Sequence, residues 1–509
     1  MAFAPKPALR ALFPPPTAQL PITHIWTVWT HLDRMDASCR KQMLSNGGVA
    51  VGWADAEMQT LDLGDQRRER RVVRMIEQFA ASPGASIPKA CGNPGDVKAT
   101  YRALGSEKIS AEEIRLAHAR ATVERVRGLK RAYLLQDTAS VDFSTRPGIQ
   151  GLGTLENRWL RGLLLHTGLL VSPAGVPLGI LHQQTWARPE EELGKKHTRR
   201  ERPIEEKESF RWLEMVDAAE SLLPLDLEVW VVGDREADIF ELLAMLRRPC
   251  MELVVRVTQD RRVESEDGKT LREAVERAPV LGKVKVALPR SRKRKKRNAK
   301  LEVQACSLEI EPPRHHRDRE QYSPVPVNVV RVREKGTVPE GEEPVEWVIL
   351  TTVPVQSLAQ ALEVVEAYAQ RWKVERYHYV LKSGCRIEDL QLESADRIDR
   401  ALAIYNVVAW RLLYMTYVAR MEPDLPCTAV LEDDEWRALF LIGAARALPE
   451  QPPSVREAVR MIARLGGFLG RKSDGEPGVQ ALWTGLRRLM DFTLAFRRLQ
   501  VLKRLVGNG

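Results

Sequence analysis

The sequence predicts an α/β core domain flanked by a helical region near the start of the chain and a helical region at its end. Apolar residues recur at intervals of three and four over residues 62–81 and 395–420, which is the spacing of one face of an α-helix. Between these segments lie short runs rich in Val, Leu and Ile, such as residues 227–232, that are typical of buried strands. A chain of 509 residues has room for roughly two to four domains.

Composition narrows the class of protein. Hydrophobic residues make up 44% and charged residues 29%, as in soluble globular proteins. The net charge of +10 favours an anionic partner, nucleic acid first, although a basic enzyme with no nucleic-acid role stays open. No run of 18 apolar residues occurs, so we expect no membrane span. The six cysteines are scattered without a C-x-x-C pair, which indicates free thiols in a reducing cytosol.

The first part of the chain divides into two segments. Residues 1–47 contain a Pro-Pro-Pro run, few acidic residues and nothing typical of a signal peptide, so we expect a poorly ordered extension. Residues 48–127 are predicted to be helical and basic, with a capping box at residues 110–113 that begins a helix. A DNA-binding head with Tyr101 and Arg102 as candidate contacts fits this pattern, and so does a plain helical domain.

Two aspartates follow predicted strands of the core, which we place at residues 128–394. Asp137 comes after the apolar run at residues 131–135, and Asp234 comes directly after the strand at residues 227–232. Because α/β sheets place ligand-binding groups at the ends of strands, both carboxylates are candidate metal ligands. The alternative for each is a helix N-cap.

Residues 251–355 contain several segments of alternating apolar and polar residues, which predict a β-rich insertion in the core. A dense cationic loop lies within it. We interpret this loop as a contact to the phosphate backbone of DNA, and its alternative is a solvated hairpin tip. Its candidate DNA-binding residues are Arg292, Lys293, Arg294, Lys295, Lys296 and Arg297.

Residues 357–382 contain no Gly or Pro and are predicted to form one helix. At about 100° per residue, Tyr368, Arg371, Glu375 and Lys382 fall within a stripe roughly 60° wide. A carboxylate among cations suits a metal ion beside a phosphodiester, because the carboxylate binds the ion and the cations bind phosphate oxygens. The alternative is a solvated helix face with ion pairs.

Asp137, Asp234 and Glu375 together form a set of oxygen ligands that can hold two Mg²⁺ ions about 4 Å apart. Such a pair of ions polarises a phosphodiester and activates a water or a 3′-OH. The nine histidines show no H-x-x-x-H spacing, which argues against a zinc hydrolase. We therefore expect Mg²⁺ as the cofactor, with Mn²⁺ able to substitute.

These residues carry a resemblance to a known family. The chain resembles the DDE transposases of the insertion-sequence-four group, and is similar to the transposon-five transposase, over about residues 52–505. The Y-x2-R-x3-E-x6-K signature of that group is filled by Tyr368, Arg371, Glu375 and Lys382. Asp137 lies in a similar Leu-Gln-Asp-Thr motif, and Asp234 lies in a similar Gly-Asp-Arg-Glu-Ala-Asp motif.

The resemblance implies a domain organisation. It predicts an RNase H-like catalytic core at residues 128–394, with the β-rich insertion inside it. A helical domain at residues 48–127 would bind transposon ends, and a helical domain at residues 395–509 would dimerise. Two protomers would pair two double-stranded DNA ends in a synaptic complex, cleave them in trans and join the 3′-OH ends to target DNA. Such a protein is expected in the bacterial cytoplasm, associated with the nucleoid.

The resemblance also implies roles for individual residues. Asp137, Asp234 and Glu375 would be the catalytic metal ligands. Tyr368, Arg371 and Lys382 would contact phosphates near a flipped base, Trp347 would stack on that base, and Arg256 would contact DNA nearby. Stacking on an indole is physically reasonable, although alternation around Trp347 also fits a core aromatic on a strand.

Some features depart from the family pattern. Residues 1–47 have no counterpart, and Arg376 follows Glu375 where an acidic residue would match the transposon-five enzyme. Two alternative functions stay open. One is a non-catalytic or inhibitory DNA-end-binding derivative, against which the three intact carboxylates count. The other is an RNase H-like nuclease without strand transfer, against which the helical flanking regions count.

Overall fold

The computed structural model describes residues 52–192, 202–264, 269–288, 296–444, 447–472 and 474–506. The predicted extension at residues 1–47 lies outside the described residues. The described chain contains two compact units. The smaller is built from Val254–Glu311 and Ser323–Glu366, and the larger from Val49–Leu253, Pro312–Tyr322 and Ala367–Gly509.

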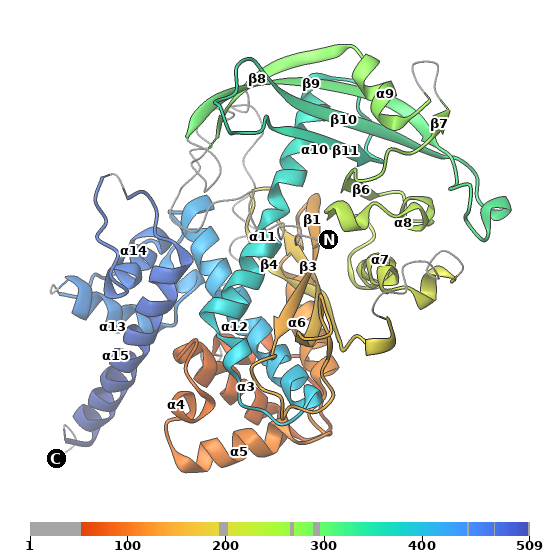
Figure 1. Ribbon diagram of the computed structural model, residues 1–509. Helices are drawn as coiled ribbons and strands as arrows, with labels where there is room; N and C mark the ends of the chain where they lie inside the picture. Colours follow the sequence, from red (N-terminus) through yellow and green to blue (C-terminus); the bar gives the residue numbers. More distant parts are fainter. Residues whose placement is uncertain are drawn as a thin grey trace. The chain divides into compact units, whose positions relative to one another are not determined.

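The larger unit begins with a run of helices, coloured red to orange in Figure 1. Their starts follow local sequence signals: Asp65, Asn93 and Ser110 each cap a helix by accepting a backbone N–H. The second helix begins at Gln66 rather than at residue 62, because Gly64 turns the chain with a φ of 67° and Asp65 then caps it. The helices are α2 (Trp53–Glu57), α3 (Gln66–Ala81), α4 (Ile87–Cys91), α5 (Pro94–Leu104) and α6 (Ala111–Glu124).

A buried charge cluster fixes these helices to one another and to the sheet. The carboxylate of Glu57 on α2 accepts hydrogen bonds from Arg125 at 2.8 and 2.9 Å and contacts His118 Nδ1 on α6 at 2.6 Å. Burial raises the pKa of Glu57, but the charge of Arg125 and the hydrogen bond from His118 outweigh it and lower the pKa to about 2. The other ring nitrogen of His118 accepts the backbone N–H of Ile180 at 3.0 Å. The helical region is therefore joined to the sheet by a paired charge rather than by apolar packing alone.

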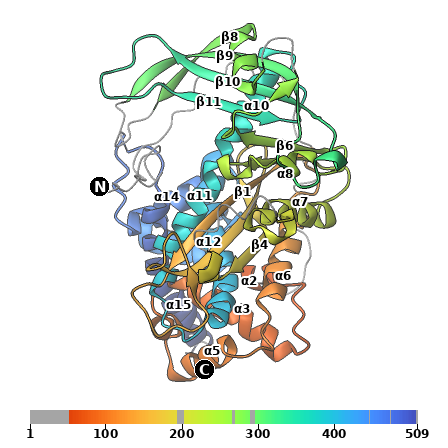
Figure 2. The same cartoon turned by 45° about the vertical axis from the view of Figure 1, so that its right-hand side comes forward.

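The sheet of the larger unit has the strand order β2-β3-β1-β5, with β4 also paired to β3. β1 runs antiparallel to β3 and parallel to β5. Its course is visible in both Figure 1 and Figure 2. The strands are β1 (Arg131–Asp142), β2 (Gly153–Thr154), β3 (Arg161–Val171), β4 (Pro177–Trp186) and β5 (Glu228–Gly233).

β1 is longer than the sequence predicted. The apolar run at residues 131–135 is only its first half, because the strand continues to Asp142 along its ladder with β3. Asp137 therefore lies inside a strand and not at its end, so the prediction of a strand-end position was wrong for this residue. Residues 137–140 are all half-buried and are polar or small, so the second half of the strand carried no apolar pattern.

Short helices follow β4 and β5, and the remaining helices complete the unit. α7 (Arg211–Leu222) precedes β5. A 3₁₀ turn (Arg235–Ala237) and α8 (Phe240–Ala244) follow β5. α12 (Ala395–Met421) contacts α3, α6 and β4 and forms the centre of the core. The C-terminal helices are α13 (Asp433–Ala444), α14 (Val455–Leu465) and α15 (Val479–Val506).

α12 is long and apolar enough to cross a membrane by length and composition, with a mean hydropathy of 1.2 in its most apolar window. Within the described part of the chain it is the one helix that meets this test, and 89% of that window is buried inside the fold. Its apolar surface is therefore accounted for by packing against other helices and the sheet.

The predicted single helix at residues 357–382 is divided in three. α10 (Leu358–Gln370) is followed by α11 (Trp372–Tyr379) and by a π-helical turn (Val380–Gly384). Arg371 keeps helical dihedral angles, φ −49° and ψ −38°, but its N–H bonds Tyr368 and its carbonyl accepts from Val374, which tightens the chain locally. In the π turn, Cys385 N–H reaches back to the carbonyl of Val380 at 2.9 Å. The single-helix prediction was wrong at these two points.

The smaller unit contains an antiparallel sheet of order β6-β11-β10-β9-β7, with β8 paired to β9. The alternating segments predicted in the β-rich insertion correspond to these strands, and a short helix, α9 (Leu271–Arg277), lies among them. The strands are β6 (Met251–Arg256), β7 (Val263–Glu264), β8 (Val280–Leu288), β9 (Arg297–Ile310), β10 (Val325–Lys335) and β11 (Glu346–Thr351).

Candidate active site

Two of the predicted ligands lie on neighbouring parallel strands. The pairing of β1 with β5 runs to Leu135 opposite Val232. Continuing the same register by two residues places Asp137 beside Asp234. Asp234 directly follows β5 and caps the 3₁₀ turn, since its Oδ1 accepts the N–H of Glu236 at 2.7 Å. The N-cap alternative is therefore true of Asp234, and it also fixes the carboxylate at the end of the strand.

The proximity of the two carboxylates has an electrostatic consequence. Burial, with the negative charge of Asp137 as the next cause, raises the pKa of Asp234 to about 6. An Asp with such a pKa is held in an environment that disfavours its charge. A site of this kind is stabilised by any cation that enters between the two side chains.

Arg371 supplies a cation from the protein itself. Its guanidinium is bonded to the carboxylate of Glu375, one turn along the helix, and its Nη1 lies 3.6 Å from Oδ1 of Asp137. Burial lowers the pKa of Arg371, but the charges of Glu375 and Asp137 outweigh it, so the net effect raises the pKa. The side chain is 11% exposed. The two carboxylates are thus joined through one buried guanidinium.

The other two signature residues lie on either side of this pair. Tyr368 is buried, with the Arg371 guanidinium 6.0 Å from its ring centroid. Lys382 lies in the π turn, where its Nζ donates to the carbonyl of Ser140 on β1 at 2.8 Å and pairs with Glu388 at 2.8 Å. The structure therefore brings the helix carrying the signature against the strand that carries Asp137. It leaves Lys382 attached to a later part of the same strand.

His378 contacts the site but was missed from the sequence. Its Nδ1 lies 3.3 Å from Oδ2 of Asp137, and the residue is 5% exposed. The histidines show no metal-ligand spacing to one another, but His378 follows Glu375 by three residues. A Glu-x-x-His pair places both side chains on one face of a helix, which was the available signal.

Metal ligation itself is not preformed. Across the described ranges, no group of three or more His, Cys, Asp or Glu side chains is gathered closely enough to hold a metal ion. The chemistry of the donor set nevertheless fits a hard divalent cation, because it consists of three carboxylates. Arg371 occupies the position of the balancing charge between two of them.

The other candidate contacts are dispersed. Arg256 and Trp347 come together on β6 and β11, with the guanidinium 5.9 Å from the ring centroid, and both are half-buried. In the helical region, Tyr101 is half-buried and Arg102 is exposed on α5. No observation above assigns DNA to these side chains, so their role stays a prediction.

The cationic loop is described only at its end. Arg292, Lys293, Arg294 and Lys295 lie outside the described residues. Lys296 is exposed, whereas Arg297 begins β9 and is bonded to the carboxylates of Glu334 and Glu342. In this structure the charge of Arg297 is therefore balanced within the β-rich unit.

Comparison with protein families accounts for the arrangement of these regions. A family model described as Transposase DNA-binding matches residues 50–109, one described as Transposase DDE domain matches residues 207–411, and one described as Transposase Tn5 dimerisation domain matches residues 407–501. The chain belongs to the Tn5-like DDE transposases. The resemblance predicted from the sequence is confirmed, and so is the fold class: a helical DNA-binding region, a mixed α/β RNase H-like core with a β-rich insertion, and a helical C-terminal region.

The family matches also bear on partners. A transposase DNA-binding region and a transposase dimerisation region together support DNA binding and homodimer formation by this transposase. The match to the DDE domain begins at residue 207 and so does not include Asp137. Its candidacy as a ligand depends on the sequence motif and on its place beside Asp234.

We predict that Asp234→Asn stabilises the metal-free transposase at neutral pH. The folded pKa of Asp234, about 6, is above its ordinary value of 3.8, so the folded state loses stability as pH rises from about 4 to 6 and the side chain ionises. Asn keeps the cap to Glu236 without the charge. The gain should reach at most ~3 kcal/mol above pH 6 and shrink towards pH 4. Thermal melts in EDTA at pH 5 and pH 8 measure it.

The matched control for this prediction is Asp424→Asn at an exposed position. It should change the melting temperature little at either pH. A melting temperature of Asp234→Asn that follows the wild type at both pH values would show that Asp234 carries no buried charge.

Proposed function

We propose that this protein is a cut-and-paste transposase. It binds transposon end repeats as double-stranded DNA, cleaves them by two-metal phosphodiester hydrolysis, and transfers the resulting 3′-OH ends to target DNA. The observation that carries the proposal is that Arg371 is bonded to Glu375 and lies 3.6 Å from Asp137, which the strand register places beside Asp234. A protein that only bound DNA would have no need of carboxylates on both sides of this guanidinium.

Asp137, Asp234 and Glu375 would hold Mg²⁺, for which Mn²⁺ is expected to substitute. When bound, the ions activate the attacking water or 3′-OH and stabilise the leaving oxygen. By fixing the position of the ions, the carboxylates would also fix where the phosphodiester oxygens are held. Asp234 is held rigidly by its cap to Glu236, whereas Glu375, with its side chain 39% exposed, is the more accessible of the three.

Arg371 has two roles in this proposal. Without DNA it neutralises Glu375 and Asp137. A phosphodiester that enters the site offers the guanidinium two non-bridging oxygens, which it can bind in the bidentate manner that it also uses for a carboxylate. Transfer of Arg371 to phosphate frees the carboxylates at the moment when the substrate arrives. Lys382 and Tyr368, on the same helical segment, are proposed to contact neighbouring phosphates.

We propose the following division of labour along the chain. Residues 48–127 bind transposon ends, residues 128–394 carry out catalysis with residues 251–355 as the β-rich insertion, and residues 395–509 dimerise. Trp347 and Arg256 are proposed DNA contacts within the insertion, as are Lys296 and Arg297 at the end of the cationic loop, and Tyr101 and Arg102 are proposed contacts in the end-binding region. Two protomers pair two ends in a synaptic complex. Because the substrate is chromosomal DNA, the proposed location is the bacterial cytoplasm.

The deciding experiment uses DNA that carries the terminal repeats of the element encoding this chain. With Mg²⁺ we expect cutting at the repeat boundary and joined products with a target plasmid. Glu375→Gln should lower cutting by at least ~100-fold, because loss of a metal ligand removes several kcal/mol of transition-state stabilisation. DNA binding in a gel-shift assay should be unchanged.

The control variant is Glu393→Gln, an exposed carboxylate outside the site. It should cut at the wild-type rate. Binding without cutting by the wild type would indicate a non-catalytic derivative. Cutting without joined products would indicate a nuclease that lacks strand transfer.

We further predict that α15 forms the dimer contact. Its last turns expose apolar side chains, and at about 100° per residue Phe492, Leu499 and Leu502 fall on one side. Leu499 and Leu502 are 58% and 54% exposed. Leu499→Asp with Leu502→Asp should convert the dimer to a monomer in analytical ultracentrifugation.

Val501→Asp is the control for the dimer contact, because at about 100° per residue this exposed position lies about 160° from Leu499 and about 180° from Phe492. It should leave the dimer intact. If both variants remain dimeric at micromolar concentration, dimerisation occurs through another surface.

A further inference from the structure

We propose that His378 is a positioning residue that orients Asp137 for metal binding, and that a buried hydrogen-bond chain from α12 fixes its imidazole. This inference rests on the proposed metal-dependent function. His378 lies outside the three carboxylates and outside the Y-R-E-K signature, and it is placed by the geometry around Asp137.

The two oxygens of Asp137 face different groups. Oδ2 lies 3.3 Å from Nδ1 of His378, and Oδ1 lies 3.6 Å from Nη1 of Arg371. The imidazole thus faces one oxygen of the carboxylate, and the guanidinium faces the other. When Arg371 moves to a phosphate, Oδ1 is the oxygen left for a cation. His378 therefore makes Asp137 a ligand through one defined atom.

His378 is itself held from behind. Its Nε2 lies 3.1 Å from Oγ1 of Thr167, the residue that pairs with Asp137 across the β1–β3 ladder. Nε2 of Gln183 on β4 donates to the same hydroxyl at 3.0 Å. The imidazole, the hydroxyl and the amide are all buried. A single line of contacts therefore crosses from Asp137 through two strands.

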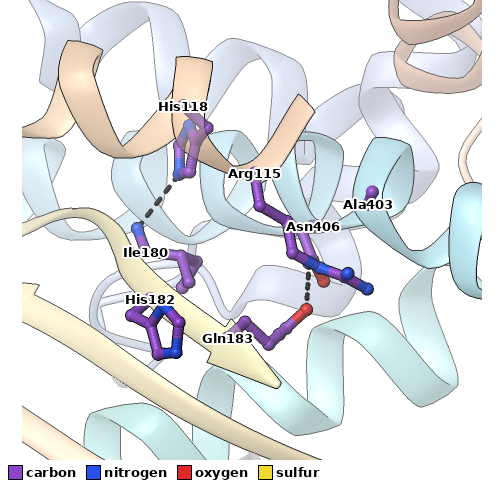
Figure 3. A pocket seen from close by; sticks show the side chains of 7 residues that line it. All are labelled: Arg115, His118, Ile180, His182, Gln183, Ala403 and Asn406. Carbon is purple, nitrogen blue, oxygen red and sulfur yellow. Dashed lines mark hydrogen bonds between the residues drawn. The ribbon is translucent and has the colours of Figure 1, made fainter. Parts of the chain in front are cut away.

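The hydrogen-bond chain ends on α12. Asn406 donates to the side-chain carbonyl of Gln183, and its own side-chain oxygen accepts from the hydroxyl of Tyr377 at 2.7 Å. Figure 3 shows Gln183 and Asn406 joined in this way at the wall of a small cavity between β4, α6 and α12. Tyr377 is the neighbour of His378 on α11. The network thus closes back on the helix that carries the imidazole.

The contacts of Thr167 bear on the proton of the imidazole. Gln183 donates to Thr167 Oγ1, and the hydroxyl keeps its own proton, which it can donate to Nε2 of His378. A neutral imidazole that accepts at Nε2 carries its proton on Nδ1, the nitrogen that faces Asp137. The proposal takes this tautomer, in which the Nδ1 proton lies on the side of the carboxylate.

A purely structural role for His378 would be satisfied by the bond to Thr167 alone. The imidazole has a second buried nitrogen, and the fold directs it at a proposed metal ligand. Partners that orient a ligand in this manner change metal affinity about 10–100-fold when they are removed. The consequence is measurable in metal binding, separately from folding.

The test compares substitutions that keep or remove each nitrogen. His378→Asn retains an N–H near the position of Nδ1, and His378→Phe retains the ring without either nitrogen. We measure binding of Mn²⁺ to the full chain by the electron paramagnetic resonance of free Mn²⁺, with and without a terminal-repeat duplex. We also measure the Mg²⁺ concentration that gives half-maximal cutting, the rate at saturating Mg²⁺, and the melting temperature.

We expect His378→Phe to weaken Mn²⁺ binding about 10–100-fold and to shift the half-maximal Mg²⁺ concentration by a similar factor. The rate should largely recover at saturating Mg²⁺. His378→Asn should stay within about threefold of the wild type. If His378→Phe binds Mn²⁺ like the wild type, or if His378→Asn is as weak as His378→Phe, the proposal is overturned.

Two further variants keep the outcome interpretable. Thr167→Val removes the hydroxyl with little change of shape and should weaken Mn²⁺ binding about threefold. This variant can be measured even if His378→Phe does not fold. Unchanged Mn²⁺ binding by Thr167→Val would overturn the role of the hydrogen-bond chain.

Asp137→Asn tests the metal site itself. If Asp137→Asn leaves Mn²⁺ affinity unchanged, the proposed function fails at this ligand. If Asp137→Asn weakens binding and His378→Phe does not, only the role of His378 fails.

Discussion

The arrangement of the active site depends on the charge of one buried guanidinium. Neighbouring carboxylates repel one another, and burial together with the negative charge of Asp137 raises the pKa of Asp234. Arg371 offsets this repulsion by pairing with Glu375 and approaching Asp137. The helix that carries Glu375 is therefore attached to the sheet by the same charge that a phosphodiester would later attract. Stability without substrate and readiness to bind substrate come from one side chain.

Much of this fold could be predicted from the sequence, because its elements carry strong local signals. Capping residues set the starts of α3, α5 and α6, and a β-branched run marked β5. The second half of β1 carried no such signal, since residues 137–140 are polar or small and all half-buried, and the strand is continued there by its pairing with β3. The tightened turn at Arg371 and the π turn after Tyr379 were also beyond reach, because both arise from tertiary contacts within a sequence that favours uninterrupted helix.

The candidate site shows a similar division. Spacing placed Arg371, Glu375 and Lys382 on one side of a helix, and the family signature directed attention to Asp137 and Asp234. Spacing alone gave no reason for Arg371 to approach Asp137, which requires the packing of the helix on β1. His378 was accessible in principle, one turn after Glu375. Its bond to Thr167 was not, because Thr167 and His378 are 211 residues apart in the chain.

The π turn at Val380–Gly384 has a consequence for how the chain tolerates change. A π turn holds one residue more than an α turn, so it behaves as a stored insertion in the helix. Loss of a single residue there would convert it to regular helix with the residues on either side still in register, but Lys382 lies inside the turn, so its bond to Ser140 depends on the shape of the turn. Glu375 and His378, which precede the turn, would keep their places. The reading frame of this helix is therefore divided in two, and length changes in its second part would alter the lysine while sparing the carboxylate.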